Sequence, residues 1–193
     1  MRKIQLLVLV FVLFSCKAFK NIKSFRNVSP IQQVMLSDNS LQSELKTYSL
    51  KIPSSWYSFR EVHGIVMHSP RVMKKRSDNF YENNFHVLEY FEKVCTATNI
   101  EELFEYYHAK KKGFYPEVDF IPKKLQHKNY GTYYLIKYGT SWSKIMLFTN
   151  IDILFHYKNR NFILSYVSEN KYYDEFIKDV EGIVNSFTIK EPN

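Results

Sequence analysis

Glycine, proline, cysteine and arginine are all scarce in this chain of 193 residues. Five glycines and six prolines exclude collagen-like and low-complexity classes. Two cysteines cannot form a disulfide framework. No apolar stretch reaches the roughly 18 residues of a membrane-spanning helix. No glycine-rich phosphate-binding motif occurs, so nucleotide binding is disfavoured.

Arginine is the minor part of a basic composition. The chain has 27 Lys+Arg against 19 Asp+Glu, a formal charge of +8, and only 6 of these basic residues are arginine. Proteins that read phosphates and bases rely on the bidentate arginine fork, so we expect no nucleic-acid partner. Apolar residues make up 45% and aromatic residues 17% of the chain. This is enough for the core of one domain.

The first fifteen residues have the pattern of a secretory signal peptide. Arg2 and Lys3 form a basic start, and residues 4–14 are apolar except for Gln5. As a helix, these eleven residues would span roughly 16 Å, well short of a ~30 Å hydrocarbon core. We therefore predict a removable leader over residues 1–15. Its loss leaves 25 basic and 19 acidic residues, a charge of +6.

The leader ends in Leu13-Phe14-Ser15-Cys16, which resembles the lipobox of bacterial lipoproteins. In that family the cysteine is acylated and becomes the first residue of the mature chain. The resemblance implies that Cys16 carries two or three acyl chains, which hold a soluble domain to a membrane. The alternative is an ordinary secretory signal. Cys95, at the end of a strand-like run, is predicted to be a small buried core residue.

Residues 16–45 are polar and weakly patterned. We predict that they form the lipidated N-terminus and a tether, with a short helix near residues 30–35. A single domain is predicted over residues 46–193. Tyr48, Leu50 and Ile52 alternate with polar residues, as in a half-buried strand. After Pro53, Trp56 is predicted to follow a turn, and residues 71–84 to form a polar loop.

Two amphipathic helices are predicted further along the chain. Thr98 and Glu101 fit a capping box, an apolar face follows, and Gly113 ends the first helix. The face comprises Ile100, Leu103, Phe104 and Tyr107. The second helix is predicted over residues 171–186. Between them, residues 125–168 alternate apolar and polar side chains and turn tightly at residues 158–161, which favours antiparallel hairpins.

These elements together resemble the PsbP-like family. The similarity rests on Ile52-Pro53-x-x-Trp56, the middle helix, the strand meander, and a closing helix that ends in Ser186-Phe187-x-Ile189. It covers about residues 46–190. The resemblance implies an α+β fold, an antiparallel β-sheet flanked by helices in an α/β/α sandwich. Members act mainly as accessory or binding proteins and share no catalytic residues, so no residue roles carry over.

We identify no catalytic, cofactor or metal site in the sequence. The histidines lack metal-ligand spacing, and no nucleophile motif frames a serine. The six histidines are His63, His68, His86, His108, His127 and His156. Carboxylate pairs such as Glu101-Glu102 lie at helix starts, where capping explains them. We therefore expect a protein that is not an enzyme and needs no cofactor.

Basic clusters provide the candidate binding residues. Lysines beside exposed aromatic residues can bind polyanions. The candidates are Lys74, Lys75, Arg76, Lys110, Lys111, Lys112, Lys123 and Lys124. The alternative interpretation of these residues is a solvated surface.

The sequence thus predicts a lipid-anchored lipoprotein of the bacterial cell envelope. We expect a non-catalytic accessory or binding module, monomeric, on the outer membrane facing the periplasm. Its expected partners are the membrane, through the N-terminal lipid, and an envelope protein or anionic polymer. Two alternatives stay open: a binder of anionic lipid or polysaccharide through the lysine-rich loops, and an envelope hydrolase.

Overall fold

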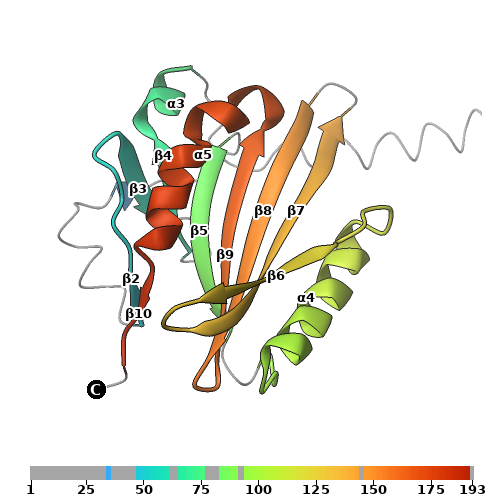
Figure 1. Ribbon diagram of the computed structural model, residues 1–193. Coiled ribbons are helices and arrows are strands. Elements are labelled where there is room, and N and C mark those ends of the chain that lie inside the picture. Colours follow the sequence, from blue (N-terminus) through green and yellow to red (C-terminus); the bar gives the residue numbers. More distant parts are fainter. Residues whose placement is uncertain are drawn as a thin grey trace, which may run out of the picture. The chain divides into compact units, whose positions relative to one another are not determined.

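The computed structural model describes residues 34–35, 47–60, 65–76, 83–90, 94–143 and 146–191. The predicted leader, Cys16 and His63 lie outside the described residues. Figure 1 shows the elements in chain order. They are β1 (Val34–Met35), β2 (Tyr48–Ser49), β3 (Trp56–Arg60), β4 (Val66–Pro70), α3 (Arg71–Arg76), β5 (Asn83–Tyr90), α4 (Ile100–Phe114), β6 (Pro122–His127), β7 (Gly131–Ser143), β8 (Met146–Tyr157), β9 (Arg160–Glu169), α5 (Asn170–Asn185) and β10 (Thr188–Ile189).

Eight strands form one antiparallel sheet in the order β1-β3-β4-β5-β9-β8-β7-β6, while β10 pairs with β2. The predicted tight turn joins β8 to β9. There Lys158 and Asn159 both have positive φ, 47° and 59°, the backbone of a hairpin turn that matches strand twist. The meander predicted over residues 125–168 therefore corresponds to four consecutive strands of the sheet.

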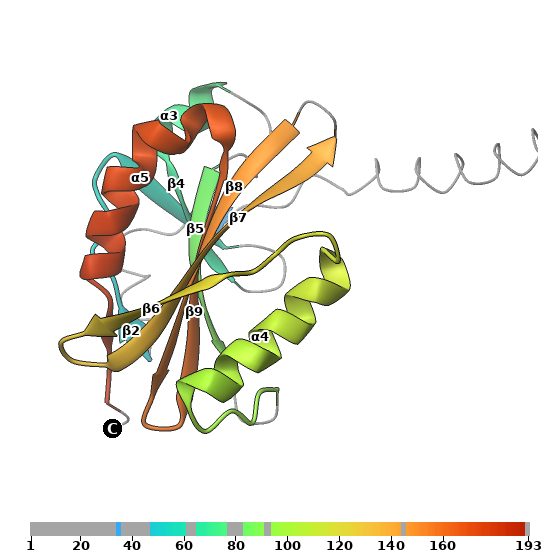
Figure 2. The same cartoon turned by 45° about the vertical axis from the view of Figure 1, so that its right-hand side comes forward.

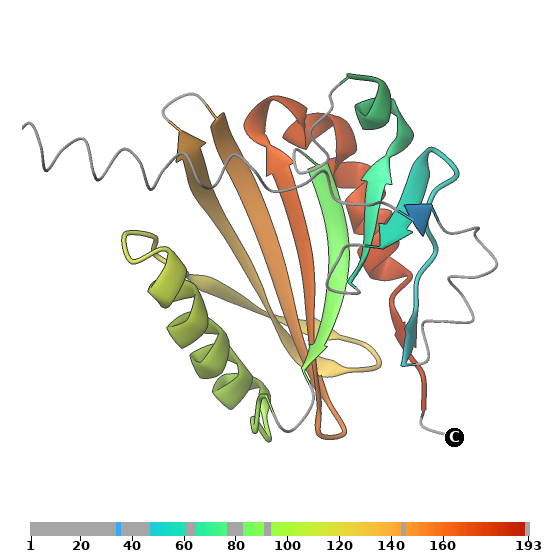
Figure 3. The same cartoon turned by 180° about the vertical axis from the view of Figure 1, so that it is seen from behind.

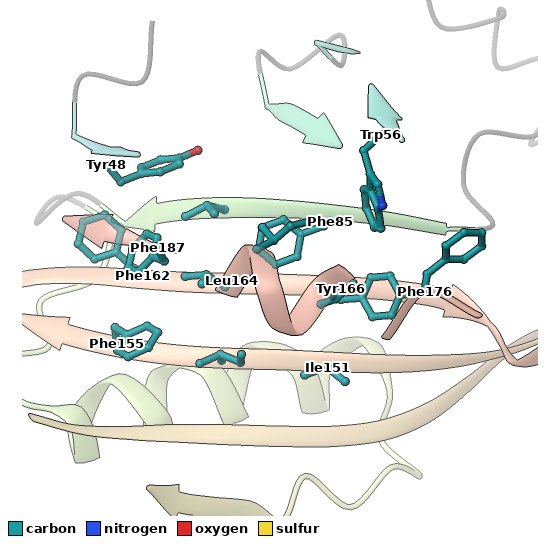
Figure 4. Packing of buried hydrophobic residues seen from close by; sticks show 14 of the residues in the cluster. Tyr48, Trp56, Phe85, Ile151, Phe155, Phe162, Leu164, Tyr166, Phe176 and Phe187 are labelled. Carbon is teal, nitrogen blue, oxygen red and sulfur yellow. The ribbon is translucent and has the colours of Figure 1, made fainter. Parts of the chain in front are cut away.

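Helix α5 packs against β9 and β8 on one face of the sheet. Its side chains Phe176, Val180 and Ile183 are buried. They meet an aromatic and aliphatic layer from β5, β8 and β9, which Figure 4 shows around Phe162 and Leu164. Each such side chain, fully buried, contributes about 1.5–3 kcal/mol to folding.

Helix α4 covers the opposite face, against β7 and β8. Figures 2 and 3 show the sheet between the two helices. Leu103, Ile136 and Leu154 are fully buried on this side. Because strand side chains alternate, odd residues of β8 face α5 and even residues face α4. The predicted α+β class, an antiparallel sheet flanked by helices, is confirmed.

The N-terminal strands differ from the prediction. Val34 and Met35, inside the predicted tether and short helix, pair with Arg60 and Phe59 as the edge strand β1. The strand predicted around residues 46–52 is reduced to β2, which pairs with β10 outside the main sheet. Trp56 opens β3 directly after a turn at residues 54–55, which confirms the predicted turn. Its indole reaches across to α5 and donates to Asp179, which explains its burial.

Two helix predictions need correction. The predicted loop over residues 71–84 contains α3, which buries Met73 in the core, and the first residues of β5. In α4 the cap is shifted by one residue: Asn99 accepts the Glu102 N–H, and the Glu102 carboxylate accepts from Thr98. The helix also continues past Gly113. The predicted apolar face of α4 and the closing helix are confirmed.

Candidate functional site

An open groove runs beside α5 on its side of the sheet. Its volume is about 330 Å³. The floor is formed by Ile151 and Ile153 of β8, one wall by β7, and the other wall by α5 between Tyr173 and Asn185. The β7 wall consists of Tyr133, Leu135 and Lys137. We call this feature the α5 groove. Figure 1 shows the position of α5 over the sheet, with the upper parts of β8 and β7 beside it.

The strand register explains why the groove is apolar and open. Paired residues of neighbouring strands share a face. One such row runs from Leu164 under α5 to Ile153, Leu135 and finally Lys123 on β6. Exposure increases along that row, from 1% at Leu164 to partial at Leu135 and high at Lys123. Helix α5 packs on β9 and β8, and the same apolar face continues onto β7, where Leu135 is partly exposed beside the helix.

Charged groups lie at the rim of the α5 groove. The Lys137 ammonium is 4.1 Å from the centre of the Tyr173 ring, a cation–π contact near the start of α5. Glu181 and Asn185 lie toward the other end of that helix. Lys123 is exposed on the same face as Leu135. The groove thus combines an aliphatic floor with Lys137 at one end, Lys123 beside its middle, and one carboxylate toward the other end.

A buried polar cluster lies on the opposite face, under α4. Asp152 accepts hydrogen bonds from Tyr107 (2.7 Å), Tyr138 (2.9 Å) and Ser165. The Lys111 ammonium lies 3.0 Å from the same carboxylate and donates to the Tyr138 hydroxyl at 2.8 Å. These five residues, here the Asp152 cluster, come from α4, β7, β8 and β9. The Asp152 side chain is 2% exposed.

The protonation states in this cluster follow from its contacts. Burial by itself raises the pKa of Asp152, but the Lys111 ammonium and the hydroxyl donors more than offset it and hold the pKa below its usual range. Burial and the neighbouring carboxylate raise the pKa of Tyr107 and of Tyr138 above the ordinary value. At neutral pH the carboxylate is therefore ionised and both phenols are protonated donors. The cluster ties α4 to the sheet by charge-assisted hydrogen bonds.

His86, Ser165 and Asp152 lie side by side on three strands, a composition also found in hydrolase triads. In a triad the histidine lies between the serine and the carboxylate. Here the Ser165 hydroxyl donates directly to Asp152, and the described partner of His86 Nδ1 is Asn84, at 3.4 Å. Desolvation lowers the pKa of His86 to about 4. Because the Ser165 hydroxyl bonds to the carboxylate and not to the histidine, these three residues do not form a nucleophile–base pair.

The three predicted binding lysines of α4 point in different directions, because neighbouring helix residues do not share a face. Lys110 is exposed. Lys111 is directed toward Asp152, with 28% of its side chain exposed. Lys112 lies 3.6 Å from Asp119. Polyanion binding by this segment stays a prediction.

The remaining predicted lysines are also separated. Lys123 and Lys124, neighbours on β6, face opposite sides of the sheet, and Lys124 lies 2.7 Å from Glu101. The described residues therefore contain no single basic patch that gathers these lysines. The backbone of Lys74, Lys75 and Arg76 lies in α3, and their side chains lie outside the described part of the structure.

Other predicted features have clear positions. Cys95 is 2% exposed in the core under α4, which confirms its predicted burial. Within the described ranges, no group of three or more His, Cys, Asp and Glu side chains could hold a metal ion. No helix in those ranges is long and apolar enough to cross a membrane.

The sequence analysis missed both the α5 groove and the Asp152 cluster. A signal for the cluster exists: Asp152 is a lone carboxylate between Ile151 and Ile153 in a strongly apolar strand. A carboxylate in that position requires donors from another element when both faces are covered. The groove has no local signal, because it depends on where α5 lies across the sheet.

No family model and no curated protein matches this chain. Similar solved structures exist at low identity. One is a crystal structure of a Bacteroides thetaiotaomicron protein, with 12% identity and a TM-score of 0.46, over 75% of this chain and 45% of that one. The chain thus spans less than half the length of that protein.

The match to this chain covers almost the full length of two other similar structures. Cyanobacterial PsbP (CyanoP) from Synechocystis has 10% identity and a TM-score of 0.49, over 85% of this chain and 96% of that one. LpqN of Mycobacterium tuberculosis, described as involved in cell envelope biogenesis, has 10% identity and a TM-score of 0.45, over 83% and 92%. The strand order and the helices on both faces assign this chain to the α+β class.

Proposed function

We propose that this chain is a bacterial cell-envelope lipoprotein with a PsbP-like domain, acting as a non-catalytic binding module. The α5 groove is the observation that carries the proposal. Its apolar β7 wall is partly exposed beside a helix, whereas the Asp152 carboxylate of the opposite face is enclosed under α4. Apolar concave surfaces that stay open are typical of ligand and partner sites.

The envelope part of the proposal rests on the leader and the lipobox-like residues before Cys16. Lipidation of Cys16 would hold the domain at a membrane, as a monomer on the periplasmic side of the outer membrane. The module would then meet its ligand in the α5 groove while the acyl chains stay in the bilayer.

Membrane fractionation tests the anchor. The Cys16→Ala variant should move from the membrane to the soluble fraction, because it has no site for the acyl chains. Cys95→Ala is the matched control, since Cys95 is a core residue, and it should stay with the membrane. A Cys16→Ala protein that still sediments with membranes would overturn the anchor.

Photo-crosslinking tests the binding site. A benzophenone amino acid in place of Leu135, in the α5 groove, should crosslink to an envelope component in living cells. The same amino acid in place of Phe114, which is 78% exposed on α4, is the control for non-specific capture. No adduct at position 135, or the same adducts at both positions, would contradict a binding role for the groove.

A further inference from the structure

The dimensions of the α5 groove restrict what it can hold. Its helical wall extends from Tyr173 to Asn185, which are twelve steps, or about 18 Å, apart along the helix. The groove is shallow, because its floor residues Ile151 and Ile153 are buried and its exposed lining comes from β7 side chains and one side of α5. A single unbranched chain of about 18 Å matches the groove in length, and its atoms can contact both walls at roughly 4 Å.

The chemistry of the groove differs between its ends. Lys137 meets the Tyr173 ring near the start of α5. Tyr133 lies four residues before Lys137 on β7. Its ring stacks on Phe155, which in turn stacks on Phe187, just after α5. Strand β7 therefore runs opposite to α5, and the groove has a lysine end and an aromatic end. Between them the floor and walls are mostly branched aliphatic side chains.

The charges at the rim favour one polarity of ligand. Lys123 and Lys137 are both exposed and both flank Leu135, one across the strand pair and one two residues along it. Glu181 lies further along α5, away from Tyr173. An anionic head group is attracted to the lysine end and repelled from the Glu181 end. The same charges disfavour a cationic head group beside Lys137.

We propose that the α5 groove binds a single-chain amphiphile with an anionic head, such as a long-chain carboxylate. The alkyl chain lies along α5 over Ile151 and Ile153, and the head group lies beside Lys137. This inference rests on the proposed binding function and adds the chemical class of the ligand. A protein partner that covers the groove from outside is the competing occupant.

Calorimetric titration of the full-length Cys16→Ala chain with fatty acids below their micelle concentration tests this assignment. Decanoate, dodecanoate and tetradecanoate should bind with affinity that rises roughly tenfold for each two methylenes, because each added methylene is buried in the groove. Dodecyltrimethylammonium has the same chain as a cationic amphiphile and should bind more weakly than dodecanoate. Affinity that does not change with chain length, or that is equal for both heads, would overturn the proposal.

Three variants locate the binding. Ile177→Trp fills the groove and should abolish dodecanoate binding. Lys137→Glu should weaken dodecanoate binding roughly fivefold. The effect is modest because Lys137 and the bound head group are both exposed to solvent, which screens their interaction. Lys110→Glu, an exposed lysine on α4, is the matched control and should leave dodecanoate binding unchanged. Thermal melts by circular dichroism verify that each variant is folded. Equal loss in Lys110→Glu and Lys137→Glu would mean non-specific charge binding and would overturn the site.

The two proposals fail separately. If position 135 crosslinks to an envelope protein while no fatty acid binds, the amphiphile assignment is wrong and the binding function stands. If neither the crosslink nor the titration gives a signal, both proposals are wrong. Chain-length-dependent binding that Ile177→Trp removes supports both.

Discussion

One sheet has two faces that its helices cover in different ways. Under α4 the sheet encloses a carboxylate, and every element that touches Asp152 supplies a donor or a cation. Beside α5, strand β7 keeps the partly exposed apolar side chains Tyr133 and Leu135, next to buried residues of β8. The first face surrounds its buried carboxylate with donors and a cation, and the second leaves apolar surface partly accessible.

This difference follows from what each kind of surface tolerates. A buried charge without partners is strongly unfavourable, so the Asp152 cluster requires that α4 stay in place. An apolar strip in contact with water is only mildly unfavourable per unit area, so β7 can keep one without a large loss of stability. We therefore expect the α4 side to govern stability and the α5 groove to govern binding. Four predictions test that division.

The largest effect should come from the carboxylate under α4. Asp152→Ala leaves Lys111 without its counter-ion and the Tyr107 hydroxyl without its acceptor, and should lower the free energy of unfolding by about 3–5 kcal/mol. Glu181→Ala removes an exposed carboxylate at the α5 groove and should change it by less than about 0.5 kcal/mol. Urea denaturation measures both. Similar values for the two variants would remove the proposed contrast.

Two tyrosines of one strand make a closer comparison. Tyr138→Phe removes a hydrogen bond to a buried carboxylate and should reduce the free energy of unfolding by about 1.5–3 kcal/mol. Tyr133→Phe removes a hydroxyl from the groove side of the same strand β7 and should change it by less than about 0.5 kcal/mol. The two substitutions remove the same atom. Denaturation curves that shift equally would show that the Asp152 cluster has no special role.

Acid should destabilise the protein through a histidine on the α5 side of the sheet. Burial lowers the pKa of His68 to about 3 in the folded state, whereas an unfolded histidine titrates near 6.5. Between these two pKa values only the unfolded chain takes up this proton. The free energy of unfolding should therefore decrease as the pH is lowered, by up to about 1.4 kcal/mol per pH unit. The low pKa of Asp152 adds a loss only at lower pH, as the folded carboxylate is protonated.

His68→Gln provides the control for this pH dependence. The variant lacks the titrating group, so its unfolding free energy should fall less steeply from pH 6.5 toward pH 4 than that of the wild type. Urea denaturation at several pH values gives both slopes. Parallel curves would mean that His68 is not the group responsible.

The smallest stability effect should come from the groove itself. Leu135→Ser removes a partly exposed side chain and should lower the free energy of unfolding by less than about 1 kcal/mol. The same variant should lose dodecanoate binding in the calorimetric titration. A variant that is strongly destabilised, or one that binds as the wild type does, would show that Leu135 does not belong to an open binding surface.

Local patterns were enough to predict the elements that carry the fold. The alternation over residues 125–168 predicts the strand meander, and the tight turn predicted at residues 158–161 joins β8 to β9. These features depend on neighbours within a few residues. Alternation puts Asp152 on the face opposite Ile151 and Ile153, but it does not show that α4 covers that face.

The missed features depend on contacts between distant segments. The turn before Trp56 is a local feature, but the hydrogen bond from its indole to Asp179, 123 residues later, is not. The short α3 is stabilised by the burial of Met73 instead of by a strong capping pattern. The α5 groove arises from the lateral position of one helix. No window of the sequence contains that information.

The pairing of β1 with β3 has a geometric consequence for the proposed lipid anchor. If Cys16 were that anchor, the 29 steps of chain from it to residue 45 could span at most about 102 Å. Because Val34 pairs with Arg60 at the sheet edge, only 18 steps separate Cys16 from the sheet, and the limit falls to about 63 Å. Under that proposal, the edge strand would shorten the greatest distance between the domain and its membrane.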